Sequence, residues 1–204
     1  MFAACSTTSL KETWISPSLH ATEIPVGAVA VLAVEERGMV RTGLENRFAR
    51  ELEGAGQPVV LTHKLLSLSE IKEDQVQAAM RLREAGAQTV LITRFVGGES
   101  RAHSVRAGKE RYAAVTTGFS SGLPYAGYGW GSYYSLAYQD MSTVWSSQSK
   151  QMQLETSLFD LTDGKPLWSC LTKTVLKESA DRVAEMDVLA DQIVSALRND
   201  GLVR

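Results

Sequence analysis

The first half of the chain alternates between two kinds of hydrophobic pattern. Residues 26–34, VGAVAVLAV, are continuously apolar and rich in β-branched side chains, which indicates a strand covered on both faces. Apolar residues then recur at every fourth position, which predicts a helix that lies with one face on the sheet. These positions are Val40, Leu44, Phe48 and Leu52.

The same order of strand and helix then repeats. Residues 58–62, PVVLT, predict a short strand, and residues 89–96, TVLITRFV, predict a buried one. Between them, apolar positions at helical spacing predict a helix that follows a capping-box pattern at Ser67 and Glu70. Short links between alternating strands and helices favour a parallel βαβαβ core.

The second half begins with a segment of different composition. Residues 118–138, GFSSGLPYAGYGWGSYYSLAY, combine glycine, serine and aromatic residues, and we expect neither a regular helix nor a regular strand there. Residues 151–158 alternate between apolar and polar side chains, as in a strand with one solvent-exposed face. Asp163 and Gly164 then predict a hairpin into a strand at 167–175, and a helix is expected from about 180 to 199.

These patterns predict an α/β fold with a βαβαβ core in a mixed sheet, a C-terminal antiparallel hairpin and a final helix, with the helices packed on the sheet. A chain of 204 residues with 44% hydrophobic and 22% charged residues fits one globular domain. We assign residues 25–204 to that domain, with an aromatic-glycine insertion at about 118–140. Residues 1–24 are polar with little periodicity after a lipobox-like start, and we expect a flexible tether.

Charge and hydropathy narrow the classes of partner. A formal net charge of −2 gives no broad basic surface for nucleic acid. No apolar run reaches the roughly 18 to 20 residues that a membrane-spanning helix needs. Contact with a membrane would therefore depend on an anchor.

A candidate anchor lies at Cys5. The motif Phe2-Ala3-Ala4-Cys5 resembles a bacterial lipobox, in which an apolar residue and two small residues precede a cysteine that receives a diacylglycerol group. The resemblance implies a lipid anchor at Cys5. Ser6 is similar to the residue found after the cysteine in lipoproteins that are sent on to the outer membrane, which implies a location at the periplasmic face of that membrane. The alternative is that Cys5 is an exposed, unmodified cysteine.

A second resemblance covers most of the chain from Val26 onward. Residues 154–160, LETSLFD, together with 164–169, GKPLWS, are similar to a hairpin of uncharacterised bacterial lipoproteins that also carry a Tyr/Gly/Trp loop. The order of the predicted elements resembles the N-terminal domain of TolB and the lipoprotein activators of penicillin-binding proteins. The resemblance implies an envelope protein, in families that include assembly factors and activators.

Polar residues at the ends of the predicted parallel strands are the candidates for an enzyme site. Ligands of open α/β sheets favour the carboxyl ends of the strands, where Glu35, His63 and Arg94 fall. A histidine with a nearby carboxylate and an arginine suits general acid–base chemistry on an anionic substrate. A hydrolase or transferase with a site around His63 is therefore the alternative function, and it requires these three side chains to converge on one pocket.

Other motifs give no indication of a metal, a cofactor or a covalent nucleophile. The loop after the first strand, EERG at 35–38, lacks the glycines of a phosphate-binding loop. His20, His63 and His103 are scattered without ligand spacing, and Cys170 lies in an apolar run. We expect no cofactor and no metal site.

The aromatic-glycine insertion is the candidate binding surface. Aromatic side chains on a glycine-rich backbone offer a large contact area to a protein or to sugar rings at low side-chain entropy cost. The candidate partner-binding residues are Tyr125, Tyr128, Trp130, Tyr133, Tyr134 and Tyr138. The alternative is that these aromatic side chains pack on the domain's own edge. A basic cluster at 101–111 either meets anionic lipid headgroups or is a solvated hairpin.

The predicted function is that of a non-enzymatic envelope lipoprotein, an adaptor or assembly module that holds an envelope protein or a cell-wall glycan. Its contact with the membrane would be the lipid anchor, and no nucleic acid is expected. The edge strands of the predicted sheet could pair with those of another copy, so a homo-oligomer is also possible.

Overall fold

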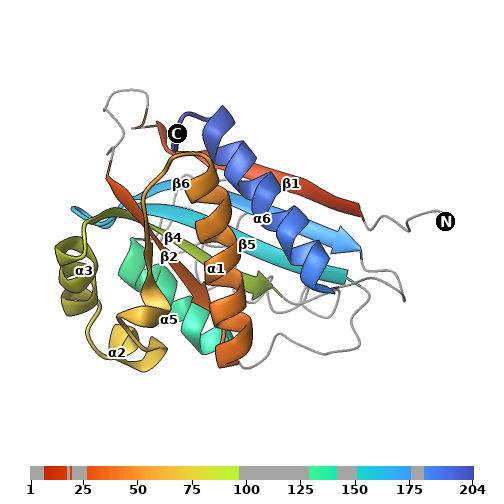
Figure 1. Ribbon diagram of the computed structural model, residues 1–204. Helices are drawn as coiled ribbons and strands as arrows, with labels where there is room; N and C mark the ends of the chain where they lie inside the picture. Colours follow the sequence, from red (N-terminus) through yellow and green to blue (C-terminus); the bar gives the residue numbers. More distant parts are fainter. Residues whose placement is uncertain (1–6, 18, 20–26, 97–128, 142–150, 176–181) are drawn as a thin grey trace.

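The computed structural model describes residues 7–17, 19, 27–96, 129–141, 151–175 and 182–204. Six strands form one mixed sheet in the order β1-β6-β5-β4-β2-β3 (Figure 1). The strands are β1 Thr7–Ile15, β2 Ala28–Val34, β3 Val59–Leu61, β4 Ala87–Val96, β5 Gln151–Asp160 and β6 Pro166–Val175. β2 runs parallel to β3 and β4, whereas β5 and β6 continue the sheet antiparallel and β1 pairs antiparallel with β6.

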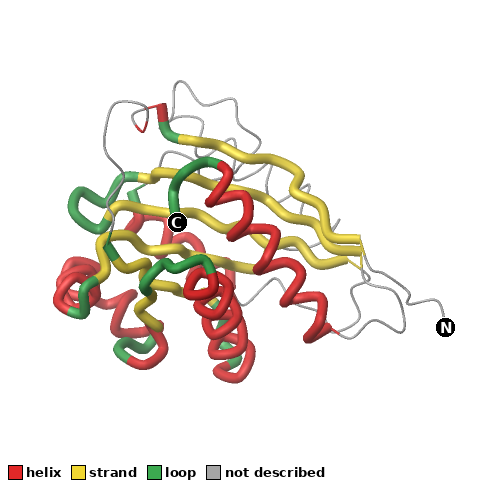
Figure 2. The backbone as a smooth tube through the Cα atoms, turned by 45° about the horizontal axis from the view of Figure 1, so that its top comes forward, coloured by secondary structure: helices red, strands yellow, loops and turns green. Residues whose placement is uncertain are grey.

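Helices cover both faces of this sheet. On one face, α1 (Gly38–Gly54) and α6 (Arg182–Asn199) share a hydrophobic cluster with alternate residues of β2, β4, β5 and β6. On the other face lie α2 (Leu68–Glu73), α3 (Gln75–Glu84) and α5 (Trp130–Asp140), and a 3₁₀ turn, η2 (Thr62–Lys64), follows β3. Figure 2 shows the strands as one twisted layer with the helices against it. No helix in the described part of the chain is both long and apolar enough to span a membrane.

The helices on both faces of the sheet explain the uninterrupted apolar sequence of β2, which lies between β4 and β3. Every residue from Val29 to Val34 is at most 3% exposed, and alternate side chains enter the two hydrophobic clusters. A parallel strand needs this cover on both faces, because its crossover helices must bury their apolar stripes there. The predicted fold class, a βαβαβ core with a C-terminal hairpin and a final helix, is confirmed.

Two local predictions are also confirmed. The Ser67 hydroxyl accepts a hydrogen bond from the Glu70 amide at 3.2 Å, and the Glu70 carboxylate accepts one from the Ser67 amide at 2.7 Å, which completes the capping box of α2. The β5–β6 hairpin turns at Gly164, whose φ of 74° lies in the left-handed region that favours glycine.

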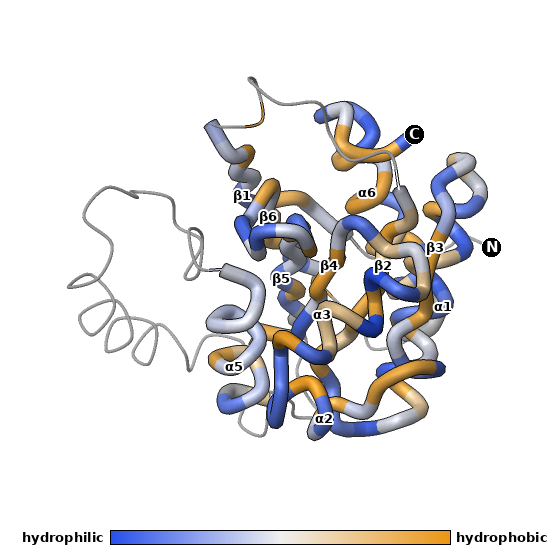
Figure 3. Tube along the Cα trace, turned by 90° about the vertical axis from the view of Figure 1, so that its left-hand side faces the viewer, coloured by the Kyte–Doolittle hydropathy of each residue, from blue (hydrophilic) through white to orange (hydrophobic). Residues whose placement is uncertain are grey.

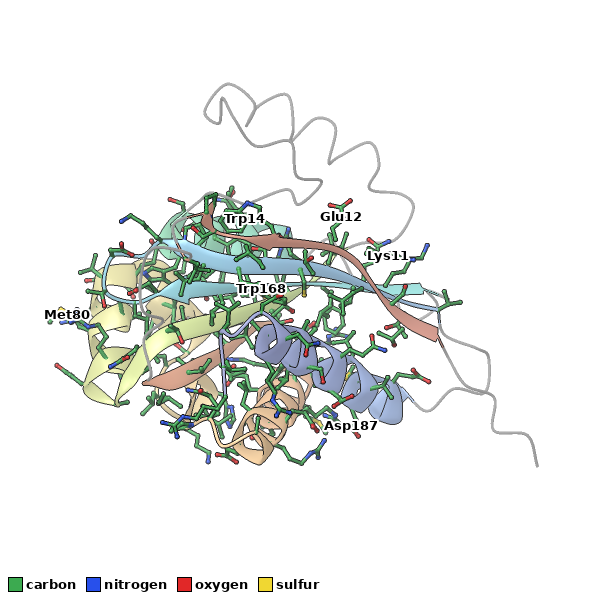
Figure 4. All side chains as sticks on the ribbon, turned by 90° about the horizontal axis from the view of Figure 1, so that it is seen from above. Lys11, Glu12, Trp14, Met80, Trp168 and Asp187 are labelled. Carbon is green, nitrogen blue, oxygen red and sulfur yellow. The ribbon has the colours of Figure 1, made fainter. Side chains whose placement is uncertain are left out.

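The prediction of a flexible tether over residues 1–24 is wrong for Thr7–Ile15, which forms the edge strand β1. Its alternation is hidden because a β-bulge between Leu10 and Glu12 inserts one extra residue. Leu10 and Ile15, an odd number of residues apart, can therefore both pack on the core beneath α6. The exposed Lys11 and Glu12 at the bulge give the segment its polar composition (Figure 4).

The expectation that residues 118–138 contain no regular helix is wrong from Trp130 onward, where α5 begins. Trp130, Tyr133, Tyr134 and Ala137 recur at helical spacing and lie at most 7% exposed against the sheet. Gly131 permits the close packing of this helix on α3, because a Cβ atom there would lie 2.6 Å from the Gln75 side-chain oxygen. Tertiary packing therefore overrides the low helix propensity of the segment.

We expect Tyr134→Ala to lower the free energy of unfolding by about 3–5 kcal/mol, because it empties a fully buried aromatic site between α5 and the sheet. Tyr134→Phe should cost about 1 kcal/mol, through loss of the 2.6 Å hydrogen bond to the Leu68 carbonyl. Urea unfolding measures both, and the exposed Met39→Ala on α1 is the control, with a change within about 0.5 kcal/mol. A Tyr134→Ala protein as stable as the control would contradict the packing of α5.

Candidate functional site

A buried carboxylate, Glu45 of α1, lies at the carboxyl end of the parallel strands. Its Oε1 accepts hydrogen bonds from the Ala33 amide of β2 at 3.2 Å and from the Thr62 hydroxyl at 2.9 Å. Its Oε2 accepts one from the His63 amide at 2.7 Å and lies 2.7 Å from His63 Nδ1. Glu45 is fully buried, so these donors replace its entire hydration.

Arg41, one helical turn before Glu45, balances the buried charge. Its Nε donates to Glu45 at 2.9 Å, and its Nη2 donates to the Leu66 carbonyl at 2.9 Å. The Arg41 side chain is only 10% exposed, and the His63 side chain is 15% exposed. The cluster of Arg41, Glu45, Thr62 and His63 therefore ties α1 to the end of β3 and to the segment before α2, with its polar atoms turned toward one another.

The other two predicted strand-end residues are held elsewhere. The Glu35 carboxylate accepts two hydrogen bonds of 2.7 Å from the Arg37 guanidinium and one of 3.0 Å from the Arg37 amide, which closes the loop between β2 and α1. Arg94 of β4 donates to Glu155 of β5, directly opposite in the sheet register, from Nε at 2.9 Å and from Nη2 at 2.6 Å.

Arg94 and His63 belong to different faces of the sheet. The Arg94 guanidinium lies 5.9 Å from the centre of the Tyr133 ring of α5, whereas His63 is bound to α1, which covers the opposite face. Burial is the main cause that raises the pKa of the Tyr133 hydroxyl well above its ordinary value, and the negative charge of Glu155 raises it further. Glu35, His63 and Arg94 therefore occupy three separate polar arrangements, and the structure does not bring them together into the predicted site.

Sequence reasoning missed Glu45 and Glu155. Glu45 lies three residues before Phe48 and seven before Leu52, so helical spacing alone places it on the buried stripe of α1. The alternating pattern places Glu155 and Ser157 on the solvent-exposed face of the strand, but both side chains are at most 1% exposed. The assignment is wrong because Glu155 is paired with Arg94, and the Ser157 and Ser169 hydroxyls lie 2.7 Å apart, which satisfies polar groups inside the sheet.

The predicted aromatic binding residues divide into three groups: three that are buried, one that is half-buried, and two outside the described residues. Trp130, Tyr133 and Tyr134 are buried, so the alternative of packing on the domain's own surface describes them, and the prediction that they form an exposed binding surface is wrong. Tyr138 is half-buried, with Lys72 Nζ 4.6 Å from its ring centre. Tyr125 and Tyr128 lie outside the described residues, as does the basic cluster at 101–111.

A groove lies where α3, the start of α5 and the β5–β6 turn meet. It has a volume of about 410 Å³, and its walls include Trp130, Arg83 and Asp163. Two apolar side chains of α3 stand at its border, Val76 at 73% exposed and Met80 at 48% exposed. Figure 3 shows the molecule from the side on which α3, α5 and α2 lie. In Figure 4 the Met80 side chain projects from the molecule, whereas Trp168 lies within it.

The groove has a firm base. The Trp130 amide donates to the Gly164 carbonyl at 2.9 Å, which joins the start of α5 to the β5–β6 turn. The side-chain Nε2 of Gln75 donates a hydrogen bond to the Ser135 hydroxyl at 2.6 Å, which joins α3 to α5. The exposed apolar surface of Val76 and Met80 is therefore presented on elements that are fixed to one another.

In the described part of the chain the cysteines and histidines give no further site, and His20 and His103 lie outside it. Cys5 lies outside the described residues, and Cys170 is fully buried in the cluster beneath α6. Burial raises the pKa of the Cys170 thiol, with a further contribution from Glu155, so the reactive thiolate is disfavoured. Within the described ranges, no three His, Cys, Asp or Glu residues are grouped so as to hold a metal ion.

Comparison with known proteins gives the fold but no family. No protein-family model matches the chain, and no curated protein matches it. The chain is similar to the solved structure of the PelC dodecamer from Paraburkholderia phytofirmans, with 12% sequence identity, a TM-score of 0.52, and coverage of 94% of this chain and 97% of that one. A variant PelC dodecamer from the same organism matches with 11% identity, coverage of 95% and 98%, and a TM-score of 0.48. The first match shows that this fold, over nearly its whole length, occurs in the subunit of a dodecamer.

We expect Glu45→Ala to lower the free energy of unfolding by about 3–5 kcal/mol, because it leaves the Arg41 charge buried without its partner. Glu53→Ala, on the exposed side of the same helix, is the matched control and should change stability by no more than about 0.5 kcal/mol. Equal urea midpoints for the two variants would show that the Glu45 cluster does not hold α1 to the sheet.

Proposed function

We propose that the chain is a non-enzymatic, lipid-anchored envelope protein that self-assembles and serves as an adaptor or assembly module. The observation that carries the proposal is the separate engagement of Glu35, His63 and Arg94 by Arg37, Glu45 and Glu155. An acid–base site needs such groups to converge around a substrate. Here each satisfies a neighbour within the fold, which favours a structural role for all three.

The anchor rests on the lipobox-like motif that ends at Cys5. Each buried methylene of an acyl chain stabilises membrane insertion by about 0.8 kcal/mol, so two or more chains hold a protein where one chain binds only reversibly. A diacylglyceryl group on Cys5 would place the domain permanently at the periplasmic face of the outer membrane. Its partner there would be an envelope protein or a cell-wall glycan.

Self-assembly is supported by two observations. The PelC structure that shares this fold is a dodecamer. The groove between α3 and α5 exposes Val76 and Met80 beside Trp130, with Arg83, Glu84 and Asp163 around them. Apolar groups within a polar border are typical of protein interfaces, and a second copy that covers the groove would remove Val76 and Met80 from water.

The anchor is tested by expression of the gene with its native upstream sequence in a bacterial host. We expect the protein in the outer-membrane fraction, and mass spectrometry should find a mature chain that begins at an acylated Cys5. Cys5→Ala is the control and should be absent from the membrane fraction. A soluble wild-type chain with an unmodified Cys5 would contradict the lipoprotein proposal and reopen the alternative of an enzyme around His63.

The assembly surface is tested with the double variant Val76→Asp, Met80→Asp. We expect its dissociation constant for self-association to rise at least roughly tenfold, equivalent to about 1.4 kcal/mol, because the interface would have to bury two carboxylates. Val188→Asp, an exposed apolar position of α6 on the opposite face, should leave association unchanged. Analytical ultracentrifugation measures all three proteins. A monomeric wild type would refute self-assembly, and equal association of the variants would refute this groove.

A further inference from the structure

We propose that one end of the sheet faces the lipid headgroups directly, and that this end is where β1 begins and β6 ends. The inference rests on the proposed acylation of Cys5, and it adds the orientation of the domain to that proposal. The headgroup region of the membrane that holds the anchor would be in contact with this end of the sheet. The short length of chain between the anchor and the first strand brings this end of the sheet close to the membrane.

Only Ser6 separates Cys5 from the first residue of β1, Thr7. Two residue steps span at most about 7 Å, since an extended chain covers no more than about 3.6 Å per residue. A flexible segment from Cys5 to Val26 would instead have allowed the domain to stand roughly 70 Å from the bilayer. The pairing of β1 into the sheet therefore removes nearly all of the expected tether.

β1 cannot lengthen the tether without leaving the sheet. It pairs with β6 from Thr7 opposite Val175 to Ile15 opposite Trp168. The hydroxyls of Thr8 and Thr174 lie 3.0 Å apart, the Gln192 side chain of α6 donates to the Thr8 carbonyl at 3.4 Å, and Leu10 packs on the core. Release of the strand would break these contacts and expose the edge of β6.

The side chains at this end are compatible with a headgroup surface. Val175, the last residue of β6, is 43% exposed, although it ends a largely buried strand. Lys173, two residues earlier, is half-buried, and its long aliphatic stem allows its ammonium group to reach anionic headgroups. Contact with the bilayer would cover the valine and bring the lysine toward lipid phosphate.

The opposite end of the sheet then faces away from the membrane. β5 and β6 each have ten residues, so the turn that joins them lies about 33 Å from Val175. Figure 1 shows the start of β1 beside the arrowhead of β6, with the C-terminus toward the other end of the sheet. The groove that includes Asp163 and Gly164 belongs to this distal end, where it is open to other copies in the aqueous space.

The orientation is tested with two variants of the acylated full chain that each gain one cysteine, Val175→Cys and Thr162→Cys, and each is labelled with a thiol-reactive fluorophore. Both positions are exposed, Cys170 is buried, and the Cys5 thiol would be consumed by the lipid. The labelled proteins are bound to phosphatidylcholine–phosphatidylglycerol vesicles that contain a headgroup-quencher lipid. We expect the label at 175 to lose most of its fluorescence and the label at 162 to keep it.

Two controls separate this proposal from the anchor itself. A 20-residue Gly/Ser linker inserted between Ser6 and Thr7 should keep the protein on the vesicles but abolish the preferential quenching at 175. Equal quenching at both positions in acylated, vesicle-bound protein would overturn the orientation and leave the anchor standing, as would quenching at 175 that the linker does not change. A wild-type chain that carries no acyl group and stays off the vesicles would overturn both proposals.

Discussion

A fully buried negative charge is the constraint on which the parallel half of the structure depends. Glu45 is fully buried, where an uncompensated carboxylate would be very costly. Its donors come from α1, from β2 and from η2, which directly follows β3, so compensation is complete only when these three elements have their final positions. The stabilisation of the charge and the register of the elements are therefore the same requirement. A polar cluster of this kind is better suited to hold a fold than to bind a substrate.

The opposite face of the sheet repeats this solution. Arg94 and Glu155 face each other across β4 and β5, and Tyr133 of α5 lies over the guanidinium. Both pairs lie near the strand ends where many α/β proteins bind ligands. In this chain the charged side chains at those ends pair with one another. Arg41 pairs with Glu45 on the face covered by α1, and Arg94 pairs with Glu155 on the face covered by α5. The remaining exposed apolar surface of the groove lies at the other end, beside the β5–β6 turn.

The parts that could be predicted from the sequence are those with local causes. β2 is apolar on both faces, the stripe of α1 repeats every four residues, and Ser67 with Glu70 forms a capping box from neighbouring positions. The parts that were missed depend on distant segments. β1 is a strand because β6 offers it an edge, and its pattern is broken by a bulge. α5 is a helix because the sheet needs cover for its second face. Glu155 is buried because Arg94 lies opposite, and a single-strand pattern cannot contain that information.

The missed strand β1 also changes how the predicted anchor would act. A long tether would uncouple the domain from the membrane, and the orientation of its surfaces would then be averaged over many positions. With β1 fixed on β6, the first residue of β1 lies two positions after Cys5, so the fold itself would set the orientation. The groove at the distal end would then be presented at a constant height and direction by every anchored copy. Copies confined to one plane with a common orientation lose much of their rotational freedom before they meet, so the apolar surface of Val76 and Met80 would associate more tightly on the membrane than it does in solution.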